Sequence, residues 1–176
     1  MDKFEKWKNE LEKELSRSLC DDEIKEIFTS NDKEEVSSNI ELIIDKIDNN
    51  VSNEIAENAL KNCGKSCIGD SMNNAIEKIK KCKDDYDIDF CIDFLNKCGV
   101  ADGSLKRNGD LIEAVYKECY CPMLESRRGT LSKTFCSCSC GWFEQLFNSI
   151  LDRKTYVEVT ESIASGGEQC RFIIHI

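Results

Sequence analysis

Apolar residues recur at helical spacing through the first half of the chain, between stretches rich in glutamate and lysine. In residues 2–17, Phe4, Trp7, Leu11 and Leu15 fall on one face, which predicts an amphipathic surface helix. The same spacing, together with start and stop residues, predicts further helices. One begins at Asp21-Asp22 and meets a stop and restart at Ser30-Asn31, and the next covers residues 40–55, with a break allowed at Asn49-Asn50. Another runs into Asn62-Cys63-Gly64, and two more cover 70–82 and 87–98, the second of which ends at Gly99.

The second half of the chain mixes strand and helix patterns. Its elements are predicted in this order: a strand over 111–121 that pairs with 104–107 and ends at Pro122, a polar loop over 123–135, a helix over 139–151, and strands over 155–164 and 168–176 that meet at a tight Gly166-Gly167 hairpin. In the last strand Cys170, Phe172 and Ile174 alternate onto one face. The predicted fold class is α+β, with a helical N-terminal half, then a small antiparallel sheet with helices on one face.

Charge excludes two classes of partner. The net charge is −10, and most of the acid excess lies in residues 1–62, so the chain repels phosphate backbones and anionic lipid. No basic patch with interleaved aromatic residues occurs, and no stretch of about 18 apolar residues could span a membrane. Nucleic acid and membrane are therefore not expected partners. The first residues are charged and carry no secretory signal, so a cytoplasmic location is expected.

Twelve cysteines dominate the candidate chemistry. Cys119 and Cys121 are followed, after an intervening loop, by Cys136, Cys138 and Cys140. Thiolates are soft ligands that bind zinc or an iron–sulfur cluster, and the loop is long enough to bring both groups together. In an extended segment, however, the two sulfurs of a CxC pair point the same way and stand about 7 Å apart. A metal site and a set of buried reduced thiols are therefore both left open.

A redox interpretation of the same residues is also open. Cys138 and Cys140 stand at a predicted helix start, where the helix dipole lowers a thiol pKa. A reversible disulfide is then expected among Cys119, Cys121, Cys136 and Cys138. A second group, Cys63 and Cys67, has i, i+4 spacing and is interpreted as two more ligands, a dithiol or two core residues. The single histidine, His175, is expected at the surface or edge of the last strand rather than as a ligand.

Three segments of the second half resemble a known family. These are Cys138-Ser139-Cys140-Gly141-Trp142-Phe143, Val157-Glu158-Val159, and Gly166-Gly167-Glu168-Gln169-Cys170-Arg171-Phe172. They resemble the C-terminal part of the 4-vinyl-reductase-like (hydrocarbon-binding) domains. Together with Cys63-Gly64 and Cys119-x-Cys121-Pro122, they are also similar to a cysteine-rich set labelled aminothiazoline-carboxylate hydrolase-like. The resemblance covers about the C-terminal two-thirds, so residues 1–55 are interpreted as a helical extension and 56–176 as the α+β domain.

The resemblance implies a fold like that of the trafficking-complex and nitric-oxide-sensing ligand-binding domains, with a pocket for a small hydrophobic molecule between helices and sheet. The pocket residues that it implies are Trp142, Phe143, Leu146, Phe147 and Cys170. Some members bind zinc through cysteines and a glutamate. Here Cys170 matches the last of those cysteines, whereas Ser162 stands where another would be. A metal would therefore draw on Cys119, Cys121, Cys136 and Cys138, with Cys63 and Cys67 as plausible neighbours.

Three hypotheses for function follow. The first is a binding domain for a small hydrophobic molecule, with a cysteine cluster that holds zinc or an iron–sulfur cluster or senses redox state. The second is a cysteine- or metal-dependent enzyme, a hydrolase or reductase acting on a small cyclic or thiol-containing substrate. The third is a plain interaction module. A homodimer is allowed by all three.

Overall fold

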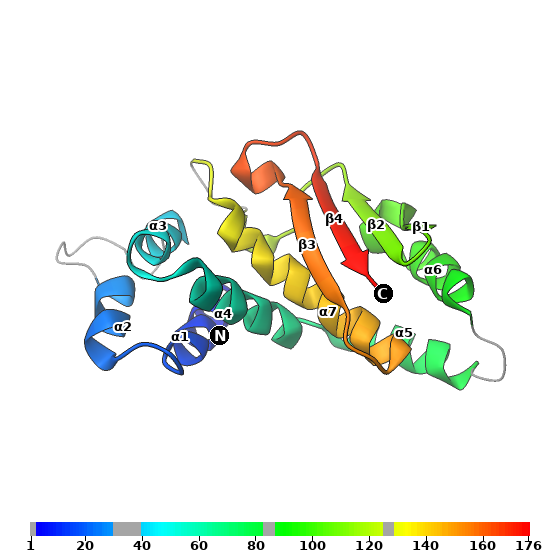
Figure 1. Ribbon diagram of the computed structural model, residues 1–176, viewed down its shortest axis with the longest axis horizontal. Helices are drawn as coiled ribbons and strands as arrows, with labels where there is room; N and C mark the ends of the chain where they lie inside the picture. The colour runs from blue at the N-terminus through cyan, green and yellow to red at the C-terminus, as the bar shows by residue number, and fades with distance from the viewer. Residues whose placement is uncertain (1–2, 30–39, 83–86, 125–128) are drawn as a thin grey trace.

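Helices form the first half of the chain and a small antiparallel sheet forms in the second half, which confirms the predicted α+β class (Figure 1). The computed structural model describes residues 3–29, 40–82, 87–124 and 129–176. Within them the helices are α1 (Lys3–Leu15), α2 (Asp21–Phe28), α3 (Ile40–Asn50), α4 (Asn53–Ser66), α5 (Asp70–Lys81), α6 (Ile88–Lys97) and α7 (Ser137–Leu151). The strands are β1 (Lys106–Asn108), β2 (Leu111–Tyr116), β3 (Tyr156–Glu161) and β4 (Cys170–His175).

Local capping fixes the helix ends. The break predicted at Asn49-Asn50 lies slightly later, because the Ser52 side chain accepts a hydrogen bond from the Ile55 amide and starts α4 there. Gly99 ends α6 as predicted, with a φ of +82° that suits glycine. The stop predicted at Ser30-Asn31 lies outside the described residues. The residues that the structure describes also include four short 3₁₀ turns: η2 (Val100–Gly103), η3 (Pro122–Leu124), η4 (Lys133–Cys136) and η5 (Ile163–Ser165).

The sheet has the strand order β1-β2-β4-β3, and every neighbouring pair is antiparallel. Ile112, Ile174 and Val157 lie in register on one face and are fully buried against the helices, while the opposite face is largely polar. The predicted tight hairpin at Gly166-Gly167 is wrong. The connection from β3 to β4 is longer and contains η5, and both strands are shorter than predicted.

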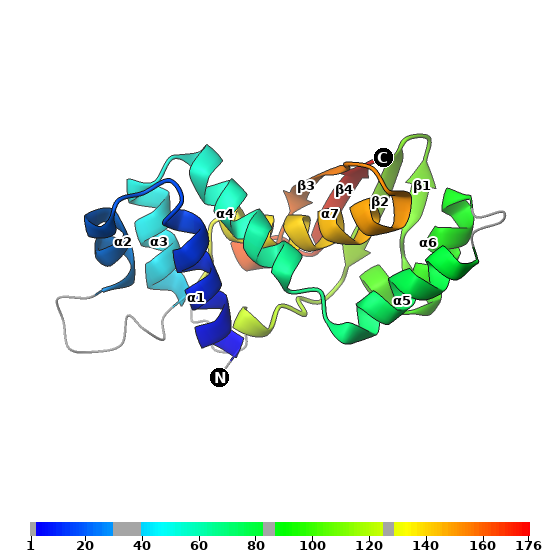
Figure 2. The same cartoon turned by 90° about the horizontal axis from the view of Figure 1, so that it is seen from below.

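Two hydrophobic cores lie on either side of the crossing between α4 and α7. Helices α1 to α4 and η4 build one core, and the sheet, α5, α6 and α7 build the other. Figure 2 shows α1, α2 and α3 at one end of the molecule, α5 and α6 at the other, and α4 between them beside α7. The expected division between residues 55 and 56 falls inside α4.

Helices α4 and α7 touch through their backbones. A Cβ atom added at Gly64 would stand 1.7 Å from the Cys138 carbonyl oxygen, and one added at Gly141 would stand 1.8 Å from the Lys61 carbonyl oxygen. No side chain fits at either place, so only glycine allows this approach. The contact holds α4 against α7 and therefore fixes how the two cores meet.

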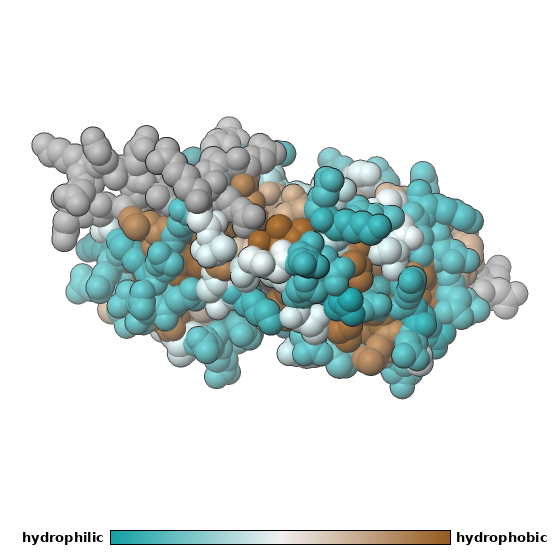
Figure 3. Space-filling model, turned by 90° about the horizontal axis from the view of Figure 1, so that it is seen from above, coloured by the Kyte–Doolittle hydropathy of each residue, from teal (hydrophilic) through white to brown (hydrophobic). Residues whose placement is uncertain are grey.

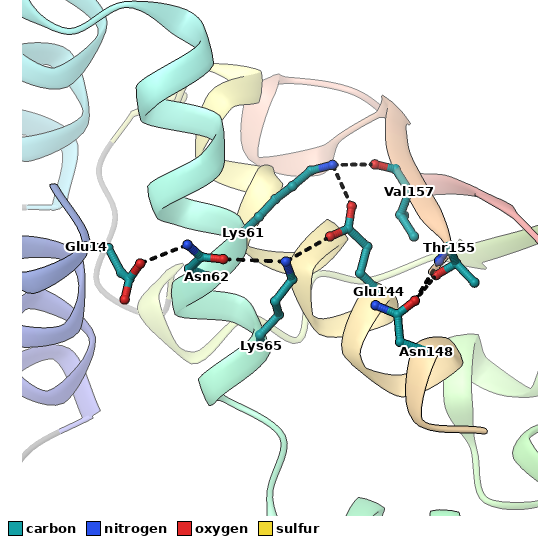
Figure 4. Close-up of polar contacts among 8 residues, drawn as sticks. All are labelled: Glu14, Lys61, Asn62, Lys65, Glu144, Asn148, Thr155 and Val157. Atoms are coloured by element: carbon teal, nitrogen blue, oxygen red, sulfur yellow. Dashed lines mark hydrogen bonds and ion pairs between the residues drawn. The ribbon is translucent and has the colours of Figure 1, made fainter. Parts of the chain in front are cut away.

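Charged side chains bind the same crossing from one side. Lys61 Nζ lies 2.7 Å from one carboxylate oxygen of Glu144, and Lys65 Nζ lies 3.3 Å from the other (Figure 4). Lys61 Nζ also donates to the Val157 carbonyl oxygen at 3.1 Å. Glu144 is buried, so these lysines compensate a charge that would otherwise be costly in the interior.

The described helices include none that is both long enough and apolar enough to cross a membrane. On the face seen in Figure 3, hydrophobic residues form several separate patches among hydrophilic ones.

The glycine contact predicts a strong effect of a single methyl group. We expect Gly141→Ala to lower the free energy of unfolding by about 3 kcal/mol, because the methyl overlaps the α4 backbone, which cannot yield without separating the helices. Urea denaturation followed by circular dichroism measures this change. Gly69→Ala is the matched control, since nothing lies within 4 Å of a Cβ at Gly69. Equal midpoints for the two variants would contradict the role given to the crossing.

Candidate functional site

A cavity of about 600 Å³ lies where α1, the end of α4, the start of α7 and the segment after β2 come together. Exposed Cys67 and Tyr120 are both part of its wall, so it reaches the surface. Its lining consists of Lys3, Lys6, Trp7, Glu10, Cys63, Gly64, Ser66, Cys67, Tyr116, Glu118, Cys119, Tyr120, Cys121, Pro122, Met123, Leu124, Phe135, Cys136, Cys138, Ser139, Trp142, Phe143, Cys170 and Phe172. We call it the thiol-lined cavity.

Seven of the twelve cysteines line this cavity, and they come from four separate parts of the chain. They are the six candidate metal ligands, Cys63, Cys67, Cys119, Cys121, Cys136 and Cys138, together with Cys170. None of the twelve forms a disulfide. The fold therefore brings together every cysteine singled out from sequence as a ligand, and adds the cysteine expected in the pocket.

The thiols contact one another in two pairs. Cys67 at the end of α4 is hydrogen-bonded to Cys138 in the first turn of α7. Cys170 at the start of β4 is hydrogen-bonded to Cys119, and its sulfur also accepts from the Ile163 amide at 3.4 Å. These pairs differ from the disulfide expected among Cys119, Cys121, Cys136 and Cys138, because each includes a cysteine outside that set of four.

Cys136 contacts a buried hydroxyl group. Its sulfur lies 2.9 Å from the Ser162 hydroxyl oxygen, at the position where the family resemblance would place another cysteine. The Cys136–Ser162 contact links the start of α7 to the β3–β4 connection, and both partners are buried.

The Cys67–Cys138 pair is electrically asymmetric. The hydrogen bond from Cys138, assisted by the nearby charge of Lys6, lowers the pKa of Cys67 to about 7 against the opposing effect of burial. The same hydrogen bond, together with burial, raises the pKa of Cys138 well above its ordinary value. Near neutral pH the negative charge therefore belongs to Cys67, with Cys138 as its S–H donor.

The expectation that the helix start lowers the pKa values of Cys138 and Cys140 is wrong. Burial raises the pKa of Cys140 to about 12, and Cys140 packs in the core beneath the sheet, outside the cavity lining. Burial also raises the pKa of Cys121 to about 12. Desolvation of a thiolate in an apolar wall is the larger effect here, and the helix dipole does not offset it.

No group of three or more cysteine, histidine, aspartate or glutamate side chains is arranged to hold a metal ion within the described residues. The thiols of the cavity contact one another in pairs, whereas tetrahedral zinc takes four ligands. Binding of zinc or an iron–sulfur cluster at these cysteines stays a prediction.

Aromatic rings form another part of the wall. Phe143 lies 5.2 Å, centroid to centroid, from Trp142 on one side and 5.2 Å from Phe172 of β4 on the other. Trp142 and Phe143 both line the cavity. Leu146 and Phe147 do not line the cavity: they follow Phe143 on the same apolar stripe of α7 but are 0% exposed, in the core beneath the sheet.

Helix α1 supplies wall residues that the sequence did not single out for the site. Trp7 lines the cavity and is 4% exposed, and its indole N–H has no hydrogen-bond acceptor within the described residues. Lys3 and Lys6 lie on the same helix and also line the cavity. In the sequence, Trp7 belongs to the apolar face of an amphipathic helix. That pattern is the same whether the face lines a cavity or packs in a filled core.

The single histidine is elsewhere. His175 lies in β4 on the polar face of the sheet, with its Nε2 atom 2.9 Å from a Glu158 carboxylate oxygen. It is not part of the cavity lining. A cysteine–histidine catalytic pair is therefore not built at this site.

The pKa of Cys67 predicts its reactivity. We expect the rate of Cys67 alkylation by iodoacetamide to rise with pH and reach half its maximum near pH 7, because the thiolate is the nucleophile. In Cys138→Ala the midpoint should move upward toward that of an ordinary thiol, since the hydrogen bond is lost. Peptide mass spectrometry over a pH series gives the rate, with exposed Cys98 in the same samples as the internal control for the reagent. An unchanged midpoint in Cys138→Ala would contradict the assignment.

Comparison with known proteins identifies a family but no characterised relative. No curated protein matches the chain, and no solved structure matches it. One family model matches residues 2–176, which is nearly the whole chain. The chain therefore belongs to the family of unknown function DUF6144.

Proposed function

We propose that this protein binds a small, largely apolar molecule in the thiol-lined cavity. The observation that carries the proposal is the cavity itself: about 600 Å³, open at the surface and walled by aromatic rings and thiols. Small-molecule sites typically occupy about 300–1,000 Å³ and combine apolar walls with a few polar groups.

The walls favour a flat or branched apolar ligand. Phe143 and Phe172 offer adjoining ring surfaces at the inner end, with Tyr116 6.2 Å from Phe143. A neutral thiol is only weakly polar and behaves as a small hydrophobic group, so most of the cysteines extend the apolar wall. Transfer of such a ligand from water buries apolar surface without stranding polar groups on either partner.

The residues of α1 in the cavity wall favour a ligand that has one polar group. The Trp7 N–H is a buried donor that a ligand oxygen would satisfy, and Lys3 and Lys6 bring positive charge to the same wall. An apolar molecule that carries a carbonyl or carboxylate group fits these features best. The resemblance to hydrocarbon-binding domains supports the same ligand class.

The cytoplasm is the proposed compartment. Thiols stay reduced there, and a protein with twelve cysteines and no disulfide suits that environment.

Filling the cavity tests the proposal. The fluorescent apolar probe N-phenylnaphthylamine should bind the reduced full chain at one site per molecule, with a rise in emission on titration. Ser139→Phe places a ring in the cavity wall and should weaken binding at least tenfold. Ser149→Phe is the matched control on the same helix, because Ser149 is not part of the lining, and it should bind like the unaltered chain.

Circular dichroism would show that both variants retain their helices. Equal affinity in Ser139→Phe and Ser149→Phe, or no probe binding by the unaltered chain, would overturn the proposed binding site.

A further inference from the structure

Backbone contact, rather than side-chain flexibility, holds Cys67 beside Cys138. The Cys138 carbonyl lies against Gly64 of α4, so closely that a Cβ at Gly64 would overlap it. Cys67 follows Gly64 by three residues, which places it on the same side of the helix. The two sulfurs therefore meet because α4 and α7 cross at this point, and they are hydrogen-bonded there.

The two thiols differ in access. Cys67 is exposed, whereas Cys138 is only partly accessible and stands behind it in the cavity wall. Lys6 of α1 brings a positive charge toward Cys67, Glu10 of the same helix opposes it, and Ser66 adds a hydrogen bond. Cys67 can therefore meet an incoming disulfide from the cavity, whereas Cys138 is the less accessible thiol beside it. An attacking thiol and a resolving thiol require this division of roles.

We propose that Cys67 and Cys138 form a redox-active dithiol that exchanges with low-molecular-weight disulfides entering the thiol-lined cavity. This activity goes beyond the binding of an apolar molecule, and it shares with that binding only the need for an open cavity.

The exchange takes place in two steps. The Cys67 thiolate attacks one sulfur of the small disulfide, whose S–S bond breaks, and one half leaves as a thiolate while the other stays bound to Cys67. Cys138 then attacks the Cys67 sulfur, and the second half leaves with the proton that Cys138 loses. Two electrons pass from the protein dithiol to the small disulfide, which ends as one thiolate and one thiol. Excess small thiol drives the same steps in reverse.

The other thiol contact in the cavity is less suited to this reaction. Cys170 is buried, and its contact with Cys119 together with burial raises its pKa far above the ordinary value. Cys63 and Cys121 also have raised pKa values because they are buried. Exchange should therefore start at Cys67, the one cysteine of the cavity that is exposed.

Disulfide mapping of the full chain tests the inference. The reduced protein is incubated with glutathione disulfide at increasing ratios to glutathione, alkylated with N-ethylmaleimide, digested and analysed by mass spectrometry. We expect the Cys67–Cys138 linked peptide to exceed every other linked pair at least tenfold and to disappear again when glutathione is in excess. This measurement uses the unaltered sequence and so does not depend on any variant folding.

Three variants separate the steps. Cys138→Ser should stop the reaction at a mixed disulfide on Cys67, because the resolving thiol is missing. Cys67→Ser should leave Cys138 without an adduct, because the attacking thiol is missing. Cys98→Ser changes an exposed cysteine outside the cavity lining and should behave like the unaltered chain.

Oxidation spread evenly over several cysteines, or no linked Cys67–Cys138 peptide in the folded chain, would overturn the dithiol. So would a Cys138→Ser variant that accumulates no more mixed disulfide than the unaltered chain. Probe binding in the reduced state distinguishes this failure from failure of the proposed function. A chain that binds N-phenylnaphthylamine but does not exchange refutes only the dithiol, and one that exchanges without binding the probe refutes only the apolar site.

Discussion

The backbone contact between α4 and α7 is the constraint on which the rest of the structure depends. Gly64 and Gly141 let the two helices approach until carbonyl groups fill the places of side chains. That approach joins the two cores and seats Glu144 between Lys61 and Lys65. It also shapes the cavity wall, because Cys67 at the end of α4 and Cys138 of α7 lie next to the contact and line the cavity. The site thus depends on helix packing together with the segment after β2, which completes the wall.

Burial then decides what each thiol can do. Seven sulfurs share one cavity. Burial raises the pKa values of Cys63 and Cys121, and the hydrogen bond to a second thiol, together with burial, raises those of Cys138 and Cys170. Cys67 differs because it is exposed and accepts a hydrogen bond from its neighbour. One exposed thiol with a lowered pKa therefore lies in the wall of the cavity proposed for an apolar ligand, which gives that cavity one nucleophile.

Periodicity predicted most of the fold because burial of one face is what helices and strands require, as α1 and β4 show. Spacing singled out six of the seven cysteines that line the cavity, and the family resemblance pointed to the seventh, Cys170. Their pairing was not predictable, because the contact of Cys67 with Cys138 depends on where α4 crosses α7. Likewise, the apolar stripe that holds Phe143 continues to Phe147, and sequence gives no sign of where a cavity ends and filled core begins. The β3–β4 turn was mispredicted because its glycines close η5 rather than a two-residue hairpin.

Strand β3 forms one edge of the sheet, and such an edge carries backbone groups able to pair with another chain. Lys61 Nζ donates a hydrogen bond to the Val157 carbonyl oxygen of this strand and also forms an ion pair with Glu144. Any incoming strand would have to displace a lysine that is only 14% exposed and leave a buried carboxylate without one of its cations. The residue that secures the helix crossing thereby also hinders the pairing of another strand with the β3 edge of the sheet.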